Sequence, residues 1–322
     1  MQPPPPSSPP PSSPPPSSPP PGSQEAGSTI RYRDVGLDQP PSAVPQARPT
    51  KGRTLGPMFW IAAGWIVLVA LAAIFANLLP LPAPDAIGSG TPLAGPSLAH
   101  LFGTDELGRD ILSRIIFGSR VSLILGFASI AIGTVIGGGL GLIAGYLGGP
   151  FDSLSNALAY IILAFPPLLL LLALAAFSKP TLLKLVAEFA FLSIAPLFRV
   201  VRAATISIAS RDFVQAALSL GATRARILMR EIFPSVLPSL VSYALLGVAL
   251  VIVGEGSLAF LGLSISLPTP SWGNMIAEGR TFLATDPWIS LFPAIAMFSV
   301  LLALNLVADK LSERLDVREG QL

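Results

Sequence analysis

The chain of 322 residues contains no cysteine and a single histidine, His100. The absence of cysteine excludes disulfides, a thiol nucleophile and cysteine-based metal sites, and one imidazole cannot form a histidine metal cluster. The sequence also lacks a Gly-x-x-x-x-Gly-Lys-Ser/Thr segment, which excludes nucleotide binding through a P-loop of its own. We therefore expect no catalytic residue, no metal site and no cofactor in this chain.

Charged side chains are scarce as well. They make up 12% of the chain, against 52% apolar residues, whereas a soluble domain carries roughly one quarter charged residues. The composition is that of an integral membrane protein, with membrane lipid as its surroundings. The formal net charge is only +2, and the arginines are scattered between apolar runs without interleaved aromatics, so we exclude nucleic acid as a partner.

The first part of the chain, residues 1–55, is rich in proline and serine. Proline clusters alternate with Ser-Ser pairs, a composition that favours extended polyproline II and cannot bury a core. We expect a disordered cytoplasmic tail, without the apolar segment and cleavage site of a secretory signal. The rest divides into a transmembrane domain, residues 56–310, and a cytoplasmic C-terminal tail, residues 311–322.

Apolar runs long enough to cross a hydrocarbon core of roughly 30 Å recur along the transmembrane domain. They predict an all-α membrane protein with six transmembrane helices, at residues 58–79, 121–147, 153–177, 182–198, 235–263 and 288–307. Six spans place both termini on one side. Lysine and arginine concentrate in the tails and in the loop between the fourth and fifth spans, which places these parts in the cytoplasm and the protein, as a multi-pass protein, in the cytoplasmic membrane.

The second span carries four glycines at intervals of four residues: Gly133, Gly137, Gly141 and Gly145. Such a strip lies on one helix face and lets another backbone approach closely. We therefore expect tight helix packing along this face. The alternative is a glycine-rich helix without a special partner.

Two features mark a possible translocation pathway. Phe165 and Pro166 are followed by a second proline, and proline in a membrane helix removes backbone hydrogen bonds and bends it. Glu255 lies within the fifth span, where a carboxylate costs a few kcal/mol and by default indicates a functional site. The glycines on either side of it leave open a position near the membrane interface.

Two polar segments are expected on the outer side of the membrane. In the first, Thr104 can cap a helix whose first turn holds Asp105 and Glu106, an arrangement that the helix dipole favours. This predicts a surface helix whose charges form either a solvated face or a docking surface. In the second, residues 264–287, prolines and Trp272 predict a rigid loop anchored at the membrane surface.

Residues 212–238 form a cationic, alanine-rich island between apolar spans. Helical spacing places on one face of a first short helix Phe213, Ala216, Ala217 and Leu220. Gly221 can take the left-handed conformation that ends this helix, and Thr223 can cap the next one. We predict two short helices hinged at a glycine, within a cytoplasmic loop at residues 203–234; an ordinary polar connector is the alternative.

These motifs resemble a known family. The island is similar to the EAA loop in the permease subunits of ABC importers. Segments 102–110, 164–166, 260–263 and 268–275 are similar to the second permease subunit of dipeptide, oligopeptide and nickel importers. The resemblance covers residues 57–317. Gln215 stands where the family usually has glutamate, Glu231 where histidine is common and Tyr160 where an aspartate often stands. Gln215 can still cap or form a hydrogen bond, and an ion pair built on the aspartate is absent here.

The resemblance implies a type I ABC importer fold of the MetI-like kind and a set of partners. These are a homologous second permease subunit in a heterodimer, two cytoplasmic ATPase subunits that bind ATP and magnesium, and an extracytoplasmic solute-binding protein. The residues implied in ATPase coupling are Gln215, Ala216, Ala217, Gly221 and Arg224. The residues implied in docking of the binding protein are Asp105, Glu106, Arg109, Asp110, Trp272 and Asn274.

The function so implied is that of a permease subunit that forms half of a pathway for dipeptides or oligopeptides and performs no catalysis itself. Similar machinery imports nickel, haem and other small solutes. A second class of function is a secondary transporter driven by protons or sodium, for which Glu188 and Glu255 are the only ionisable candidates at membrane depth. A membrane scaffold without transport activity is a third.

Overall fold

The computed structural model describes residues 56–176 and 179–319. Regular structure in these ranges is helical, apart from one isolated β-bridge between Thr104 and Asp110. The elements are, in order, α1 (Pro57–Ile74), η1 (Ala76–Leu78), α2 (Ile111–Gly133), η2 (Thr134–Gly138), α3 (Gly139–Leu147), α4 (Gly149–Ala164), α5 (Pro167–Ala175), α6 (Leu182–Ala209), α7 (Asp212–Ser219), α8 (Arg224–Ile227), η3 (Leu228–Ile232), α9 (Phe233–Phe260), α10 (Trp272–Gly279), η4 (Arg280–Phe282) and α11 (Trp288–Glu319).

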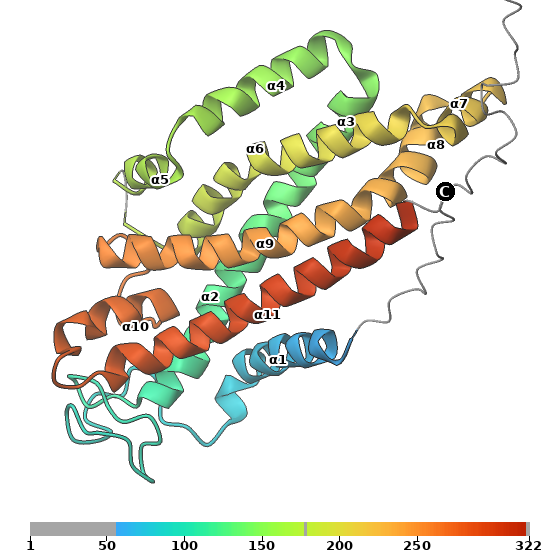
Figure 1. The fold of residues 1–322 in the computed structure, drawn as a ribbon. Helices are drawn as coiled ribbons and strands as arrows, with labels where there is room; N and C mark the ends of the chain where they lie inside the picture. Colours follow the sequence, from blue (N-terminus) through green and yellow to red (C-terminus); the bar gives the residue numbers. More distant parts are fainter. Residues whose placement is uncertain (1–55, 177–178, 320–322) are drawn as a thin grey trace, which may run out of the picture. The chain divides into compact units, whose positions relative to one another are not determined.

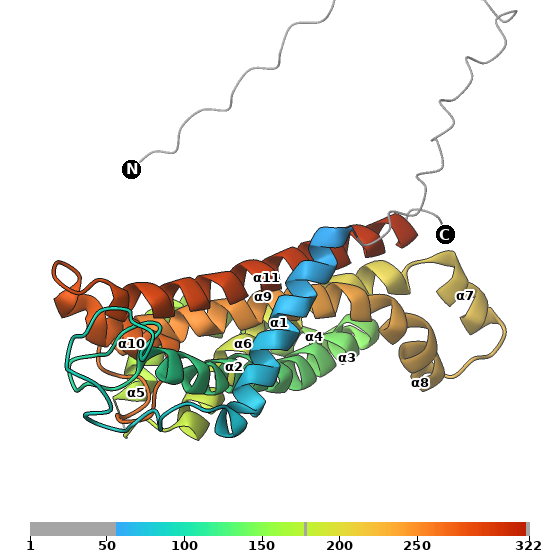
Figure 2. The ribbon, with the colours of Figure 1, turned by 90° about the horizontal axis from the view of Figure 1, so that it is seen from below.

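Five helices in the described ranges are long and apolar enough to cross a membrane, and α4 with α5 adds a sixth span if the pair is one crossing. If α4 and α5 form one crossing, the number of spans is the six that the sequence predicted. The long helices α2, α6, α9 and α11 pack along one another, while α1 crosses α2 and α11 (Figures 1 and 2). α7 and α8 lie at one end of this bundle, hereafter the arginine-rich end, and α10 lies at the other, the loop end (Figure 1).

Several helices continue past the limits of the apolar runs that predicted the spans. The second span begins at Ile111 and the fourth extends to Ala209, so residues 203–209 are helix and not loop. The fifth is one helix from Arg224 to Phe260, with a π-helical turn in η3, and the sixth continues beyond residue 307. Hydropathy falls where arginine and lysine appear, but both are good helix formers, so the backbone stays helical.

The predicted bend at Phe165 and Pro166 is confirmed, and it is sharp. α4 and α5 meet at 83° across this break. Phe165 and Pro166 are extended, with ψ values of 135° and 126°, because the residue before a proline avoids the helical region. Pro167 then starts α5 at a position where its missing N–H costs nothing.

The glycine strip packs against α6 as expected. A Cβ atom at Gly133 would lie 2.7 Å from Ser193 Cβ, one at Gly141 would lie 2.5 Å from the Phe198 carbonyl oxygen, and one at Gly145 would lie 2.9 Å from the Arg202 carbonyl oxygen. At Gly137 the added carbon would collide with the backbone of Ile194. The two backbones therefore run in direct contact over several turns, which only glycine permits.

This contact predicts a difference between two neighbouring glycines of α3. Gly141→Ala should destabilise the protein by about 1–3 kcal/mol, because its methyl group meets the fixed backbone of α6. Gly139→Ala is the matched control, since a Cβ there meets nothing within 4 Å. The midpoint of thermal unfolding of each purified variant in detergent tests this. Equal midpoints for the two variants would contradict close packing of this strip.

Candidate functional site

The island at the arginine-rich end is built as two helical pieces joined at Gly221, as predicted. α7 ends in a turn in which Gly221, at φ +81°, donates its N–H to the Leu218 carbonyl at 2.9 Å. The side chain of Thr223 accepts the N–H of Arg226 and caps α8. The second piece is not separate, however, because α8 continues through η3 into α9. The sequence did not show this, since Pro234 suggests a break. The helix continues through this proline, with the π-helical turn η3 directly before it.

This unit, residues 212–232, is fastened to the ends of three other helices. Val214, Ile227 and Ile232 are fully buried in one apolar cluster. The same cluster contains side chains from α3, α6 and α9, namely Leu142, Leu197, Val201, Ile208, Val236 and Leu240. A displacement of the unit is therefore transmitted to these helices through close packing.

The side chains predicted to couple to an ATPase lie on or beside this unit. Gln215 and Ala216 are exposed, and Ala217 is half-buried. The amide nitrogen of Gln215 donates to the Ala209 carbonyl at 3.3 Å, which links α7 to the last turn of α6. A glutamate at this position would have no such donor. Exposed Arg224, together with Gln215 and Tyr146, lines a cavity of about 310 Å³ beside α7.

At the loop end, the predicted surface helix from Thr104 does not form. Residues 104–110 are a tight loop, and the helix begins at Ile111 with Asp110 as its cap, accepting the N–H of Ser113 at 2.8 Å. Asp105 instead accepts the backbone N–H groups of Leu107 and Arg109 at 2.9 Å each. The carboxylates of Asp105 and Asp110 both accept backbone N–H groups of residues that follow them. The tertiary position of α2 decides that Asp110 starts the helix.

Asp105 and Arg109 belong to a buried ion cluster that also includes Arg114 and Glu278. Arg109 Nε lies 2.6 Å from Asp105 Oδ2, and Arg114 bonds both Asp105 and, at 3.0 Å, Glu278 Oε2. The cluster joins the loop, the first turns of α2 and α10. Arg114 and Glu278 were not identified from the sequence, where nothing relates residues so far apart.

The remaining predicted docking residues are mostly buried too. Trp272 donates its indole N–H to the Ile115 carbonyl at 3.1 Å, and the amide of Asn274 donates to the Ile265 carbonyl at 2.7 Å. With Asp105, Arg109 and Asp110 also buried, the side chains of five of these six residues are not on the surface. They fix the loop, the start of α2 and α10. Glu106 is exposed, and its docking role remains a prediction.

Glu255 is enclosed within the chain, and its pathway role remains a prediction. Its side chain is 1% exposed and accepts hydrogen bonds from the hydroxyls of Ser264, at 2.5 Å, and Ser271, at 2.7 Å. It therefore holds the α9–α10 connection against the end of α9. Glu188, the other ionisable candidate, is buried with its carboxylate 3.5 Å from Lys184. Phe165 and Pro166 are exposed at the bend, and their pathway role remains a prediction.

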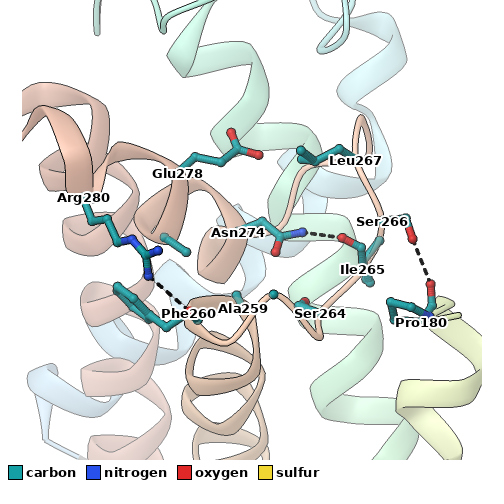
Figure 3. A pocket seen from close by; sticks show the side chains of 12 residues that line it. Pro180, Ala259, Phe260, Ser264, Ile265, Ser266, Leu267, Asn274, Glu278 and Arg280 are labelled. Carbon is teal, nitrogen blue, oxygen red and sulfur yellow. Dashed lines mark hydrogen bonds between the residues drawn. The ribbon is translucent and has the colours of Figure 1, made fainter. Parts of the chain in front are cut away.

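Beside this connection, the loop end has a cavity of about 430 Å³ between the α5–α6 turn and α10 (Figure 3). Ser266 donates to the Pro180 carbonyl at 3.3 Å on one side, and Arg280 donates to the Phe260 carbonyl at 3.1 Å on the other. Glu278 also lines the cavity, so that its wall carries polar groups and both signs of charge. A hydrated or polar group fits such a wall better than hydrocarbon does.

The ion cluster predicts a large cost for removing one buried charge. Arg114→Ala leaves Arg109 as the one arginine paired with both Asp105 and Glu278. One buried negative charge is then uncompensated, which should cost about 3–5 kcal/mol of stability. Arg280→Ala is the control, because this arginine is exposed at the same end of the molecule. Thermal unfolding of the purified variants measures both. If Arg114→Ala unfolds at the temperature of the control, the cluster does not hold the loop end together.

Comparison with known proteins agrees with this architecture. Residues 137–319 match the family model of the binding-protein-dependent transport system inner membrane component. The fold is similar to a chain of the MetNI methionine ABC transporter in an inward-facing conformation, with a TM-score of 0.52 at 18% identity, over 65% of this chain and 97% of that one.

Curated relatives are more similar in sequence. The dipeptide transport system permease protein DppC of Alkalihalophilus pseudofirmus is 36% identical over 255 residues, which cover 79% of this chain and 84% of the relative. The glutathione transport system permease protein GsiD of Escherichia coli is 36% identical over 286 residues, covering 85% and 94%. The chain therefore belongs to the inner membrane components of binding-protein-dependent transport systems, and is a multi-pass ABC transporter permease of the cytoplasmic membrane.

Proposed function

We propose that this permease forms half of the translocation pathway of an ATP-driven importer of short peptides. The names of DppC and GsiD specify dipeptide and glutathione transport, and glutathione is itself a tripeptide. The similarity to both extends over most of this chain and most of each relative. The other half of the pathway is a homologous permease subunit, and an external solute-binding protein delivers the peptide to the loop end.

The observation that carries the proposal is the mechanical continuity of the arginine-rich end with the membrane domain. The α7–α8 unit is packed on α3, α6 and α9, and α8 forms one helix with α9. A force applied to this unit from the cytoplasm therefore acts directly on a transmembrane helix. Two ATPase subunits, which bind ATP and magnesium, supply that force, and this chain takes no part in the hydrolysis.

The test is reconstitution of the chain with the permease, ATPase and binding-protein subunits encoded beside it. We expect peptide-loaded binding protein to stimulate ATP hydrolysis and to drive peptide uptake into proteoliposomes. Uptake that continues without ATP and stops on addition of an uncoupler would instead establish an ion-coupled transporter. If nickel-loaded or haem-loaded binding protein stimulates ATP hydrolysis and peptide-loaded binding protein does not, the protein is an ATP-driven importer but peptides are not its substrate.

The hinge at Gly221 gives a sharper prediction. Proline cannot adopt the φ of +81° found here and has no N–H to donate to Leu218. Gly221→Pro should leave membrane insertion intact but abolish peptide uptake while basal ATP hydrolysis continues. Gly221→Asn is the control, because asparagine tolerates a left-handed conformation. Unchanged uptake in the proline variant would show that the hinge geometry is not needed for coupling.

A further inference from the structure

The cavity at the loop end has the size of a small-molecule site. Its volume of about 430 Å³ lies within the roughly 300–1,000 Å³ typical of ligand pockets. Segments far apart in the chain enclose it: Pro180 before α6, the end of α9, the connection from Ser264 to Leu267, and α10 with Arg280 (Figure 3). The distribution of lysine and arginine predicts that this end faces outward. In an importer, the cavity therefore lies on the side from which the substrate arrives.

Hydrogen bonds within the chain hold the wall of the cavity in place. Asn274 of α10 donates its amide N–H to the Ile265 carbonyl at 2.7 Å. Ser264, at the start of the connection, donates its hydroxyl to the buried carboxylate of Glu255. A ligand thus meets a site that is already shaped and does not have to order it, which lowers the cost of binding.

The two charged side chains of the wall are not equivalent. The carboxylate of Glu278 is compensated, because its Oε2 atom lies 3.0 Å from Arg114 and 3.4 Å from Arg109. Arg280 is exposed, and within the described residues no ion pair joins it to an acid. Its Nη1 donates to the Phe260 carbonyl at 3.1 Å, which holds the guanidinium beside the cavity (Figure 3). The uncompensated charge of this wall is therefore positive.

An unpaired guanidinium beside a polar cavity favours a carboxylate as ligand. Its parallel N–H groups match the two oxygens of a carboxylate, and such charged pairs are roughly twice as strong as neutral hydrogen bonds. The rest of the wall combines apolar side chains, Phe260 and Leu267 among them, with hydroxyl and amide groups. Short peptides carry the same mixture, because every unmodified peptide ends in a carboxylate while its side chains vary. The positive balance disfavours a metal cation.

We propose that this cavity is a receiving site for short peptides on the outer side of the permease, and that Arg280 binds their C-terminal carboxylate. The site recognises the end that different peptides share, and the open wall at Phe260 and Leu267 accepts side chains of different shape. This inference rests on the proposed function, since it identifies where and by which chemistry this chain first contacts the substrate.

A purely structural role is the alternative for Arg280. Phe260 is the last residue of α9, and a cation there can bind the final carbonyls and the negative end of the helix dipole. This role predicts a lower stability without Arg280 and no effect on any peptide. A role in binding predicts an effect that depends on the carboxylate of the peptide.

The test uses the absence of cysteine, since a cysteine placed in the wall is then unique in this chain. Leu267→Cys lies at a position of the wall that is 59% exposed, and the permease complex is held in nanodiscs without binding protein. Trialanine should slow the reaction of this cysteine with a maleimide, by half at the dissociation constant. Trialanine amide lacks the C-terminal carboxylate and should require a concentration about tenfold higher or more.

Leu98→Cys is the matched control, because Leu98 is 99% exposed at the same end and does not line the cavity. Its reaction rate should change with neither peptide. In the Leu267→Cys background, Arg280→Ala should abolish the difference between trialanine and its amide. Arg280→Lys should restore part of it, because lysine keeps the charge but not the fork. The thermal unfolding midpoint of each variant, measured without peptide, separates loss of binding from loss of structure.

Two results would contradict the site itself. If trialanine and its amide protect Leu267→Cys equally, or if Arg280→Ala leaves the protection by trialanine unchanged, Arg280 does not bind the carboxylate. If peptide-free binding protein protects the cysteine and trialanine does not, the cavity is a contact of that protein and not a peptide site.

Uptake measurements separate this inference from the function on which it rests. If peptide-loaded binding protein drives ATP-dependent uptake while trialanine never protects the cysteine, the importer stands and the receiving site is wrong. If trialanine protects the cysteine but only nickel-loaded or haem-loaded binding protein drives uptake, the peptide function is wrong and the cavity remains a carboxylate site.

Discussion

The close contact of the glycine strip with α6 is the constraint on which the rest of the bundle depends. Between membrane helices there is little hydrophobic driving force, since lipid is as apolar as leucine, so association relies on packing and polar contacts. Gly137 and Gly141 bring two backbones together and thereby set the position of α6. α6 in turn packs on α9 and α4, and its last turns carry the cluster that holds the α7–α8 unit. A contact between four glycines and one helix thus supports the α7–α8 unit, the coupling surface of the proposed importer.

The loop end is held together by a different kind of interaction. Here buried charges and hydroxyls are matched to one another: Glu255 with two serines, and Asp105 and Glu278 with two arginines. Each of these groups would be costly if left alone in a low dielectric, so the loop adopts a conformation in which each has a partner. For this reason, most of the residues that the sequence assigned to docking are buried at this end and hold the loop, α2 and α10 together. The surface at this end is formed by the side chains that this framework leaves exposed, Glu106 among them.

One helix connects the two ends. From Arg224 to Phe260 the backbone is helical without interruption. Its first turns are fixed by Ile227 and Ile232 in the apolar cluster, and its far end is fixed by Glu255 in the serine contacts. A helix so fastened at both ends is suited to relay a displacement across the membrane. The sharp break between α4 and α5 provides the contrasting element, a pair of apolar helices that meet at 83°.

The sequence by itself determined the features that local chemistry controls. Long apolar runs specify membrane helices, two consecutive prolines specify a break, and Gly221 with Thr223 specifies a helix end followed by a helix start. Periodicity also located the glycine strip and the apolar face of α7. What it could not decide is which side of an element meets the rest of the protein. The apolar face of α7 is exposed because Val214 fills the cluster beneath, Asp110 and not Thr104 starts α2, and Glu255 is enclosed by serines from a later segment. These outcomes depend on contacts between residues distant in the chain, and only the tertiary structure brings such residues together.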